Sequence, residues 1–306
     1  MTRLTIAEAE TLVRDALRAA GWPADAPLVS LKPPKATRPS CVFRLDSPTR
    51  PAVLKVWSPA MSAKAARQVA RQDAVARGLG DGAFRAPAIL FFDPDRHVVA
   101  MALVAGRDAG ALWQDSGDLA HLRRAGSWVA ALHGLSAEQV AFRPAGLLNW
   151  LDRLQAELVE GGRPIPDAES FREAAAGVQA LASTVRKAPA RRAITHRDLN
   201  LSNMIIGDMV WGLDFENDRP DDAARDIAHL ALDAMARAPQ AIAPRAVLAA
   251  LRDGYGDSGT APEVTLFLQR CFCLGVWANT KLQPSRVNQA RLDAARWLLK
   301  QDEPLI

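Results

Sequence analysis

The residue types that could do chemistry gather in one segment of the chain, residues 194–218. Two short apolar runs there are separated by Gly207-Asp208, the pattern of a hairpin with a two-residue turn. A hairpin brings the residue before its first strand close to the residue after its second, so we expect Asn203 beside Asp214. Amide and carboxylate oxygens suit Mg²⁺, which takes a few protein oxygens and completes its shell with phosphates and water. The segment therefore predicts a magnesium site at the open end of a hairpin.

A further carboxylate precedes this hairpin. Asp198 lies in the loop that enters it and is expected to face the same opening, where it could orient an attacking hydroxyl or accept its proton. The string HRDLNLSN, which ends at Asn203, and the following pair Asp214-Phe215 match the pattern H-R-D-L-x-x-x-N and D-F. That pattern is typical of kinase-type phosphoryl transfer. Glu216 stands where protein kinases carry glycine.

This arrangement resembles the aminoglycoside phosphotransferase and choline kinase group, the small-molecule branch of the protein-kinase-like fold. The Asp-Phe-Glu variant, the acidic stretch that runs on to Asp226, and the segment Leu132-His133-Gly134-Leu135 carry the resemblance to that branch. The resemblance implies an α+β fold of two lobes. A small N-lobe with an antiparallel sheet is expected over residues 1–104. A larger, mainly helical C-lobe is expected over residues 105–306.

The resemblance also implies a reaction, in which the γ-phosphoryl group of ATP moves to a hydroxyl of a small molecule with the help of Mg²⁺. Asp198 would orient the acceptor hydroxyl, and Asn203 and Asp214 would hold the metal ion. Lys55 would contact the α and β phosphates. The family pairs this lysine with a helix carboxylate, and Asp73 is the nearest candidate in the helix expected after the lysine strand.

The lobe-connecting hinge of the resemblance falls on the apolar run 98–106. Adenine would be recognised there by the carbonyl of Ala102 and the N–H of Val104, and Met101 would border the adenine pocket. An ordinary core strand is the alternative. No G-x-G-x-x-G loop precedes the lysine strand, and residues 32–40 are expected in its place.

The acceptor class depends on charge. Acidic residues outnumber basic ones over residues 214–226, although Asp214 and Asp226 have expected internal roles as metal ligand and as helix cap or loop brace. The remaining acids would suit an amino-alcohol, an aminosugar or an aminoglycoside-like acceptor. A solvated acidic loop that has no bearing on the acceptor is the alternative. The chain lacks an activation segment, which argues against a protein substrate.

Two other functions compete with the small-molecule kinase. A catalytically silent, nucleotide-binding regulator on the same fold is favoured by the missing glycine loop, whereas the intact Asp198, Asn203 and Asp214 count against it. A metallohydrolase could use His196 with the two aspartates, but the remaining histidines show no metal-ligand spacing.

The elements that must position these residues are readable in part. Residues 41–45 and 52–56 alternate apolar and polar side chains around a breaker-rich turn and predict an antiparallel hairpin. Lys55 would then lie on the face opposite Leu54. A capped helix is expected before this hairpin and another over residues 60–79. The second part of the chain is expected to be helical apart from the hairpin at 204–213, with helical stretches at 148–160, 167–186, 223–237, 243–253 and 263–300.

Composition sets the cellular context. The 306 residues are 49% hydrophobic and 24% charged, which is typical of globular proteins, and a net charge of +4 is too small to indicate a nucleic-acid or membrane partner. Three cysteines favour buried thiols in a reducing compartment over a disulfide framework. The chain shows neither a transmembrane run nor the apolar core of a signal peptide. We therefore predict a cytoplasmic protein and leave its oligomeric state open.

Overall fold

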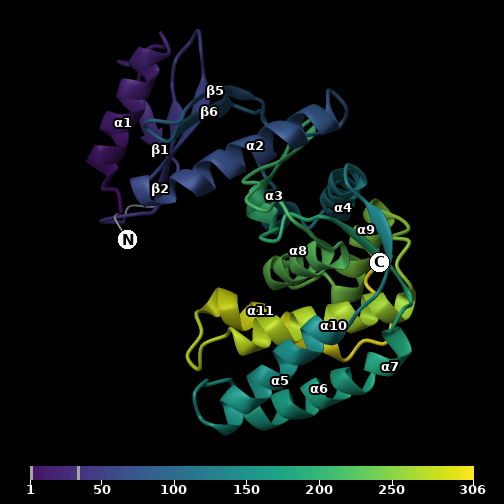
Figure 1. Ribbon diagram of the computed structural model, residues 1–306. Helices are drawn as coiled ribbons and strands as arrows, with labels where there is room; N and C mark the ends of the chain where they lie inside the picture. The colour runs from purple at the N-terminus through teal and green to yellow at the C-terminus, as the bar shows by residue number, and fades with distance from the viewer. Residues whose placement is uncertain (1–2, 33–34) are drawn as a thin grey trace. The chain divides into compact units, whose positions relative to one another are not determined.

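The computed structural model describes residues 3–32 and 35–306. Residues 33–34, part of the segment expected in place of a glycine loop, lie outside the described residues. The chain divides into two compact units. The small unit comprises Met1–Gly106 and Gly207–Asp218, and the large unit comprises Arg107–Ile206 and Arg219–Ile306 (Figure 1). The small unit holds an antiparallel sheet and the large unit is mainly helical, which confirms the predicted fold class.

The small unit is built on a five-stranded sheet in the order β1-β2-β3-β6-β5, in which every neighbouring pair is antiparallel. Its strands are β1 (Leu28–Ser30), β2 (Ser40–Leu45), β3 (Ala52–Trp57), β5 (Ile89–Asp93) and β6 (Val98–Ala102). Two helices pack on it, α1 (Ile6–Ala19) and, after a short 3-10 turn at Pro59–Met61, α2 (Ser62–Leu79). The unit also holds a parallel pair, β4 (Phe84–Arg85) with β11 (Val210–Gly212).

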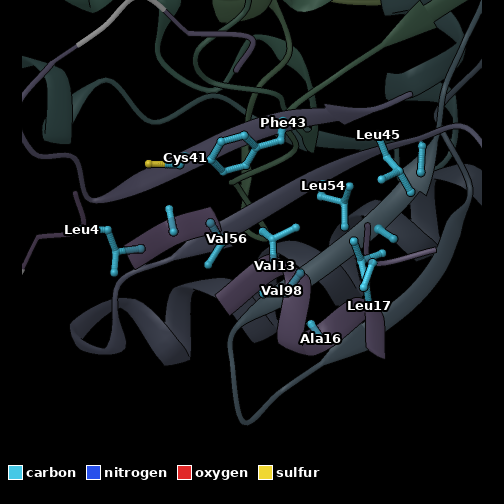
Figure 2. Packing of buried hydrophobic residues seen from close by; sticks show 14 residues of the cluster. Leu4, Val13, Ala16, Leu17, Cys41, Phe43, Leu45, Leu54, Val56 and Val98 are labelled. Carbon is cyan, nitrogen blue, oxygen red and sulfur yellow. The ribbon is translucent and has the colours of Figure 1, made fainter. Parts of the chain in front are cut away.

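The two faces of this sheet have different neighbours. Leu54 and Val56 of β3 are fully buried in a cluster that includes Val13 and Leu17 of α1 (Figure 2). Because side chains alternate along a strand, Lys55 lies on the other face, toward α2. The predicted hairpin and the predicted face of Lys55 are both confirmed.

The large unit is a set of helices with a second, smaller sheet (Figure 1). The helices are α3 (Ala109–Ser116), α4 (Leu119–Gly134), α5 (Ala145–Val159), α6 (Ala168–Ala180), α7 (Ala182–Val185), α8 (Ala224–Arg237), α9 (Pro244–Tyr255), α10 (Pro262–Ala278) and α11 (Arg286–Leu299). The three-stranded sheet has the order β12-β9-β8, with β12 at Pro220–Asp222, β9 at Pro189–Ile194 and β8 at Glu138–Ala141. The sequence did not predict this sheet.

One prediction for the second part of the chain needs correction. The stretch 263–300 is two helices, because Pro284 cannot donate a backbone hydrogen bond and Ser285 starts a new helix by capping Asn288 N–H. The strands expected at 204–213 are present as β10 (Met204–Ile206), which also pairs with β7 (Arg107–Asp108), and β11, and in the turn between them the Gly207 N–H donates to the carbonyl of Met209 at 3.0 Å.

Helices α4 and α9 of the large unit pack closely, and this packing positions two side chains of a buried polar network. A Cβ atom at Gly254 of α9 would lie 2.0 Å from the carbonyl oxygen of Arg123 on α4, and one at Gly126 would lie 2.6 Å from the carbonyl oxygen of Leu251. Glycine is therefore required on both sides of this crossing. The crossing brings Tyr255, at the end of α9, to His133, at the end of α4.

Helix α8 holds the loop that carries the HRD string. The Asp226 carboxylate, fully buried, accepts hydrogen bonds from the backbone N–H of His196 (2.5 Å) and of Arg197 (2.8 Å). It also accepts one from Nε2 of His133 at 3.0 Å, while Nδ1 of His133 lies 2.9 Å from the Tyr255 hydroxyl. His133 and Asp226 are thus framework residues, in line with the loop-brace role expected of Asp226.

This network fixes an unusual backbone. Arg197 has φ +68°, a left-handed conformation that a non-glycine residue adopts only under constraint. Two turns further along α8, the Asp233 carboxylate accepts a hydrogen bond from the Leu201 N–H at 3.0 Å and pairs with Arg237. Because residues seven apart share one face of a helix, a single face of α8 anchors both ends of the loop.

Replacing Asp226 by Asn should destabilise the protein by about 2–4 kcal/mol, because a buried charged acceptor with three donors is lost. Burial raises the pKa of Asp226, but the hydrogen bonds from His133 and the His196 amide outweigh it and hold the pKa below its ordinary value. A lowered pKa stabilises the folded state above the unfolded pKa, so the loss should be full near neutral pH. The difference in stability between the wild type and Asp226→Asn should shrink as the pH falls through the native pKa of Asp226. Urea unfolding at several pH values measures it.

Asp253→Asn is the matched control for this experiment, because Asp253 forms only an exposed ion pair with Arg123 at 3.5 Å. Such pairs contribute little to stability. An Asp226→Asn variant as stable as the control at neutral pH would contradict the bracing role.

Candidate active site

The small unit gathers opposite charges around Lys55. Its Nζ lies 2.5 Å from Oδ1 of Asp214, 3.1 Å from Oε1 of Gln68 and 3.8 Å from Oε1 of Glu216. The ammonium also lies 5.0 Å from the ring centroid of Trp57. Only 5% of Lys55 is exposed, so these contacts replace most of its hydration. The cluster brings together Lys55 and Asp214, two of the residues predicted for the site.

Helix α2 contributes to this cluster with one face. Lys64 pairs with Glu216 at 2.5 Å, and one turn later Gln68 donates from Nε2 to Oδ1 of Asp214 at 2.5 Å. Residues four apart lie on the same helix face, whereas Asp73 is five residues beyond Gln68 and points elsewhere. Asp73 pairs with Arg77 at 2.6 Å, and its side chain is 45% exposed.

The helix partner of Lys55 is therefore a neutral amide. The sequence predicted a carboxylate at this position and singled out Asp73, and the structure does not bring Asp73 to the lysine. The signal that could have found Gln68 is the helical spacing of Ala65, Gln68 and Gln72, which are the buried residues of α2 together with Val75. A buried glutamine on the inner face of a helix needs a polar partner, and here that partner is the Lys55–Asp214 pair.

Asp214 occupies a constrained position. Its φ of +66° is left-handed, a conformation that aspartate tolerates better than most residues. Burial raises the pKa of Asp214, but the Lys55 charge and the hydrogen bonds from Lys55 and Gln68 outweigh it, so the pKa lies below its ordinary value. Both donors bind Oδ1. The second oxygen is left as a hard, charged ligand that suits a divalent cation.

A third lysine faces this cluster from the segment before β2. Burial, and after it the neighbouring charge of Lys55, lower the pKa of Lys32. Lys32 is the described beginning of the segment expected in place of a glycine loop. The small unit thus directs Lys32, Lys55 and Lys64 toward the residues 214–216, and several cations near one another suit a polyphosphate.

The predicted hinge residues continue from strand β6. Met101 and Ala102 pair with Val53 and Ala52 of β3, so Met101 lies on the same sheet face as Lys55. Ala102 donates its N–H to the carbonyl of Ala88 at 2.9 Å. Val104 follows in a segment with neither helix nor strand.

The large unit carries Asp198 and Asn203. The backbone carbonyl of Asp198 accepts a hydrogen bond from Nδ2 of Asn203 at 2.8 Å and one from Nδ2 of Asn200 at 3.1 Å. Since the amide nitrogen of Asn203 is used in this way, its oxygen is the atom that a cation would meet. Asp198 is exposed, while its backbone carbonyl is held by these two side-chain amides.

Asp198 lines a pocket of about 490 Å³ that lies within the large unit. Besides Asp198, its walls come from α5, α8, α10 and α11 and from the segment between the last two helices. The lining residues are Leu147, Trp150, Arg225, His229, Cys271, Phe272, Gly275, Val276, Asn279, Thr280, Asn288 and Arg291. Sequence reasoning missed the two arginines, because helices far apart in the chain bring them together.

The structure bears on the competing metal chemistry. Among the described residues no group of three His, Cys, Asp or Glu side chains could hold a metal ion, so a metallohydrolase centred on His196 has no ligand set there. All three cysteines are buried and free. Within residues 3–32 and 35–306, no helix has both the length and the apolar character of a membrane span.

Comparison with known folds agrees with this geometry. A choline/ethanolamine kinase family protein from Mesorhizobium loti superimposes with a TM-score of 0.55 at 19% identity, over 95% of this chain and 96% of that chain. The aminoglycoside phosphotransferase APH(4)-Ia superimposes with a TM-score of 0.56 at 15% identity, over 94% of this chain and 95% of that chain. The spectinomycin phosphotransferase APH(9)-Ia was solved with ADP and spectinomycin. It superimposes with a TM-score of 0.52 at 10% identity, over 100% of this chain and 96% of that chain. At these identities the likeness is one of fold.

Sequence comparison gives the family. No functionally curated protein matches the chain significantly. The model of the phosphotransferase enzyme family, however, matches residues 32–265, which include both Lys55 and the segment from His196 to Asp214. This match covers well over half of the chain and confirms the resemblance that the motif carried. The chain belongs to the phosphotransferase enzyme family.

Proposed function

We propose that this small-molecule phosphotransferase uses Mg-ATP and transfers its γ-phosphoryl group to a hydroxyl of an acceptor bound in the pocket beside Asp198. The observation that carries the proposal is the placement of Asp198: its carboxylate lines that pocket while its backbone is held by two asparagine amides. A carboxylate presented rigidly at the wall of a pocket can hold a hydroxyl in one orientation.

The cations of the small unit support the nucleotide part of the proposal. Lys55 would bind the α and β phosphates, with Gln68 and Asp214 holding its ammonium in place. The buried position of the ammonium, with Gln68 rather than water beside it, strengthens its interaction with a phosphate oxygen. Backbone groups of Ala102 and Val104 would recognise adenine, beside Met101. The ADP in the spectinomycin phosphotransferase of similar fold supports a nucleotide in this role.

The donor set supports Mg²⁺. Asn203 offers a neutral oxygen and Asp214 an anionic one, and both are hard ligands of the kind that Mg²⁺ takes alongside phosphates and water. When bound, the ion would neutralise charge on the phosphates during transfer. The residues of this chain do the rest: Lys55 fixes the donor and Asp198 orients the acceptor.

The step itself is a substitution at phosphorus. A bond forms between the acceptor oxygen and the γ-phosphorus, and the bond from that phosphorus to the oxygen bridging it to the β-phosphate breaks. The electron pair of the broken bond stays on ADP, and the hydroxyl proton passes to the Asp198 carboxylate and on to solvent. Little covalent chemistry falls to the protein, so positioning and electrostatics supply most of the rate.

A silent regulator on the same fold is the second candidate, because the partner of Lys55 on α2 is an amide and not a carboxylate. It would bind nucleotide without turnover. Metal-dependent release of ADP in the presence of an acceptor separates the two functions.

Asp198→Asn should lower kcat by about 10²-fold or more, because the hydroxyl loses its oriented acceptor. Nucleotide affinity should stay within about twofold, since the small unit holds the binding cations. ADP release and nucleotide titration by fluorescence measure the two quantities. Asp253→Asn, exposed on α9, serves as the control. Full turnover by Asp198→Asn would remove Asp198 from the mechanism.

Gln68→Ala should raise the KM for ATP about five- to thirtyfold, because Lys55 and Asp214 lose a buried hydrogen-bonding partner worth about 1–2 kcal/mol. Asp73→Asn on the same helix should change this KM less than twofold, because it removes only an exposed pair with Arg77. Steady-state kinetics with varied ATP distinguishes the two variants. The opposite order would restore Asp73 as the helix partner of Lys55.

A further inference from the structure

The acceptor pocket has an unexpected charge. Three of its lining residues are charged at neutral pH, and two of them, Arg225 and Arg291, are cations. The third is Asp198, whose carboxylate the proposed function already uses for the hydroxyl. The charged side chains that remain to bind the rest of the acceptor are therefore both positive.

Arg225 is held in place from two sides. Its guanidinium carbon lies 5.5 Å from the ring centroid of Phe272 in the pocket wall, and its Nη1 lies 3.2 Å from Oδ2 of Asp221. Asp221 also lies 3.6 Å from Nε of Arg197, so one carboxylate serves two guanidinium groups. The charge of Arg225 is therefore only partly compensated.

Arg291 has no such partner. Among residues 3–32 and 35–306, the only side chain found in polar contact with it is His229, whose Nδ1 lies 3.5 Å from Nη2. Burial, and after it the charges of Arg225 and Arg291, lower the pKa of His229 to about 4, so the ring is neutral at physiological pH. A neutral ring does not offset the charge of Arg291. Asn288, three residues before it and on the same face of α11, adds an amide to the pocket wall.

None of the acids of residues 214–226, Asp218 included, lines the pocket, and four of them interact with other groups. Glu216 pairs with Lys64 in the small unit, Asp221 pairs with two arginines, and Asp226 braces the loop. Burial and the neighbouring Asp221 raise the pKa of Asp222 to about 6, and its carboxylate, still mostly ionised at neutral pH, interacts with the charges of Arg192 and Arg225. None of these four residues lines the pocket. An ammonium group placed there would meet two guanidinium groups, which disfavours amino-alcohols and aminosugars.

We propose that the acceptor is a hydroxyl compound that carries an anionic group, a carboxylate or a phosphate, bound by Arg291 and Arg225 while its hydroxyl meets Asp198. The proposal rests on the proposed function and adds the substrate class. A guanidinium offers a planar fork of donors that matches the oxygens of either anion. The anionic group takes no part in the bond changes and serves to position the hydroxyl.

Acceptor profiling tests the proposal. ADP release from Mg-ATP is measured with D-glycerate and D-gluconate as carboxylates, with glycerol 3-phosphate as a phosphate, and with choline and glucosamine as cations. The primary amides of the carboxylates are the uncharged controls. We expect kcat/KM for at least one anionic acceptor to exceed that of its uncharged control, glycerol in the case of the phosphate, by about tenfold or more. Which arm responds identifies the anion.

Variants locate the effect. Arg291→Gln should raise the KM for the anionic acceptor roughly ten- to hundredfold with a smaller change in kcat. Arg291→Lys keeps the positive charge but not the planar set of guanidinium donors, so its KM should lie between those of the wild type and Arg291→Gln. Arg286→Gln, exposed on the same helix and outside the pocket, should match the wild type. Circular dichroism verifies that each variant is folded.

The contrary outcomes are distinct. Turnover that depends on Asp198 but prefers choline or glucosamine, or that is indifferent to both Arg291 variants, overturns the anionic acceptor and leaves the proposed function standing. An absence of ADP release in every arm overturns the proposed function, and the acceptor proposal with it.

Discussion

One buried carboxylate determines the form of the active-site loop. Asp226 has no exposed surface, and its two oxygens accept hydrogen bonds from two consecutive backbone amides and from His133. A carboxylate without water must have such donors, and the donors in turn fix the left-handed backbone at Arg197. The packing of α4 on α9, which needs glycine at residue 254, delivers His133 and Tyr255 to the same network. The position of Asp198 at the pocket wall follows from this framework.

The small unit also holds a buried charged group, the ammonium of Lys55, and stabilises it with side chains instead of backbone amides. Strand alternation places Lys55 on the α2 side of the sheet, away from the apolar cluster under α1 (Figure 2). A lysine that is 5% exposed needs compensation, and Asp214 with Gln68 supplies it. The neutral amide adds no negative charge to that of Asp214 and Glu216, so it compensates the ammonium less than a third carboxylate would. The contacts that stabilise the buried Lys55 in the fold are thus the same ones that would hold it for a phosphate.

The sequence predicted the features that repeat with a regular period or that belong to a fixed-spacing motif. The hairpin at β2 and β3, the face of Lys55 and the family were all readable in this way. The sheet of β8, β9 and β12 was not, because β8 and β12 are short and the β9 sequence shows no clean alternation. Gln68 was missed because a carboxylate was sought where an amide stands. The pocket arginines were out of reach, because only tertiary packing brings α8 and α11 together.

We propose that the chain moves a phosphoryl group from Mg-ATP to the hydroxyl of an anionic small molecule. Phosphorus NMR of a reaction with the best anionic acceptor tests it most directly. We expect a new phosphomonoester resonance that grows in equal amount with ADP, and that grows about 10²-fold or more slowly with Asp198→Asn. ADP accompanied only by inorganic phosphate would mean that water is the acceptor and would contradict the account.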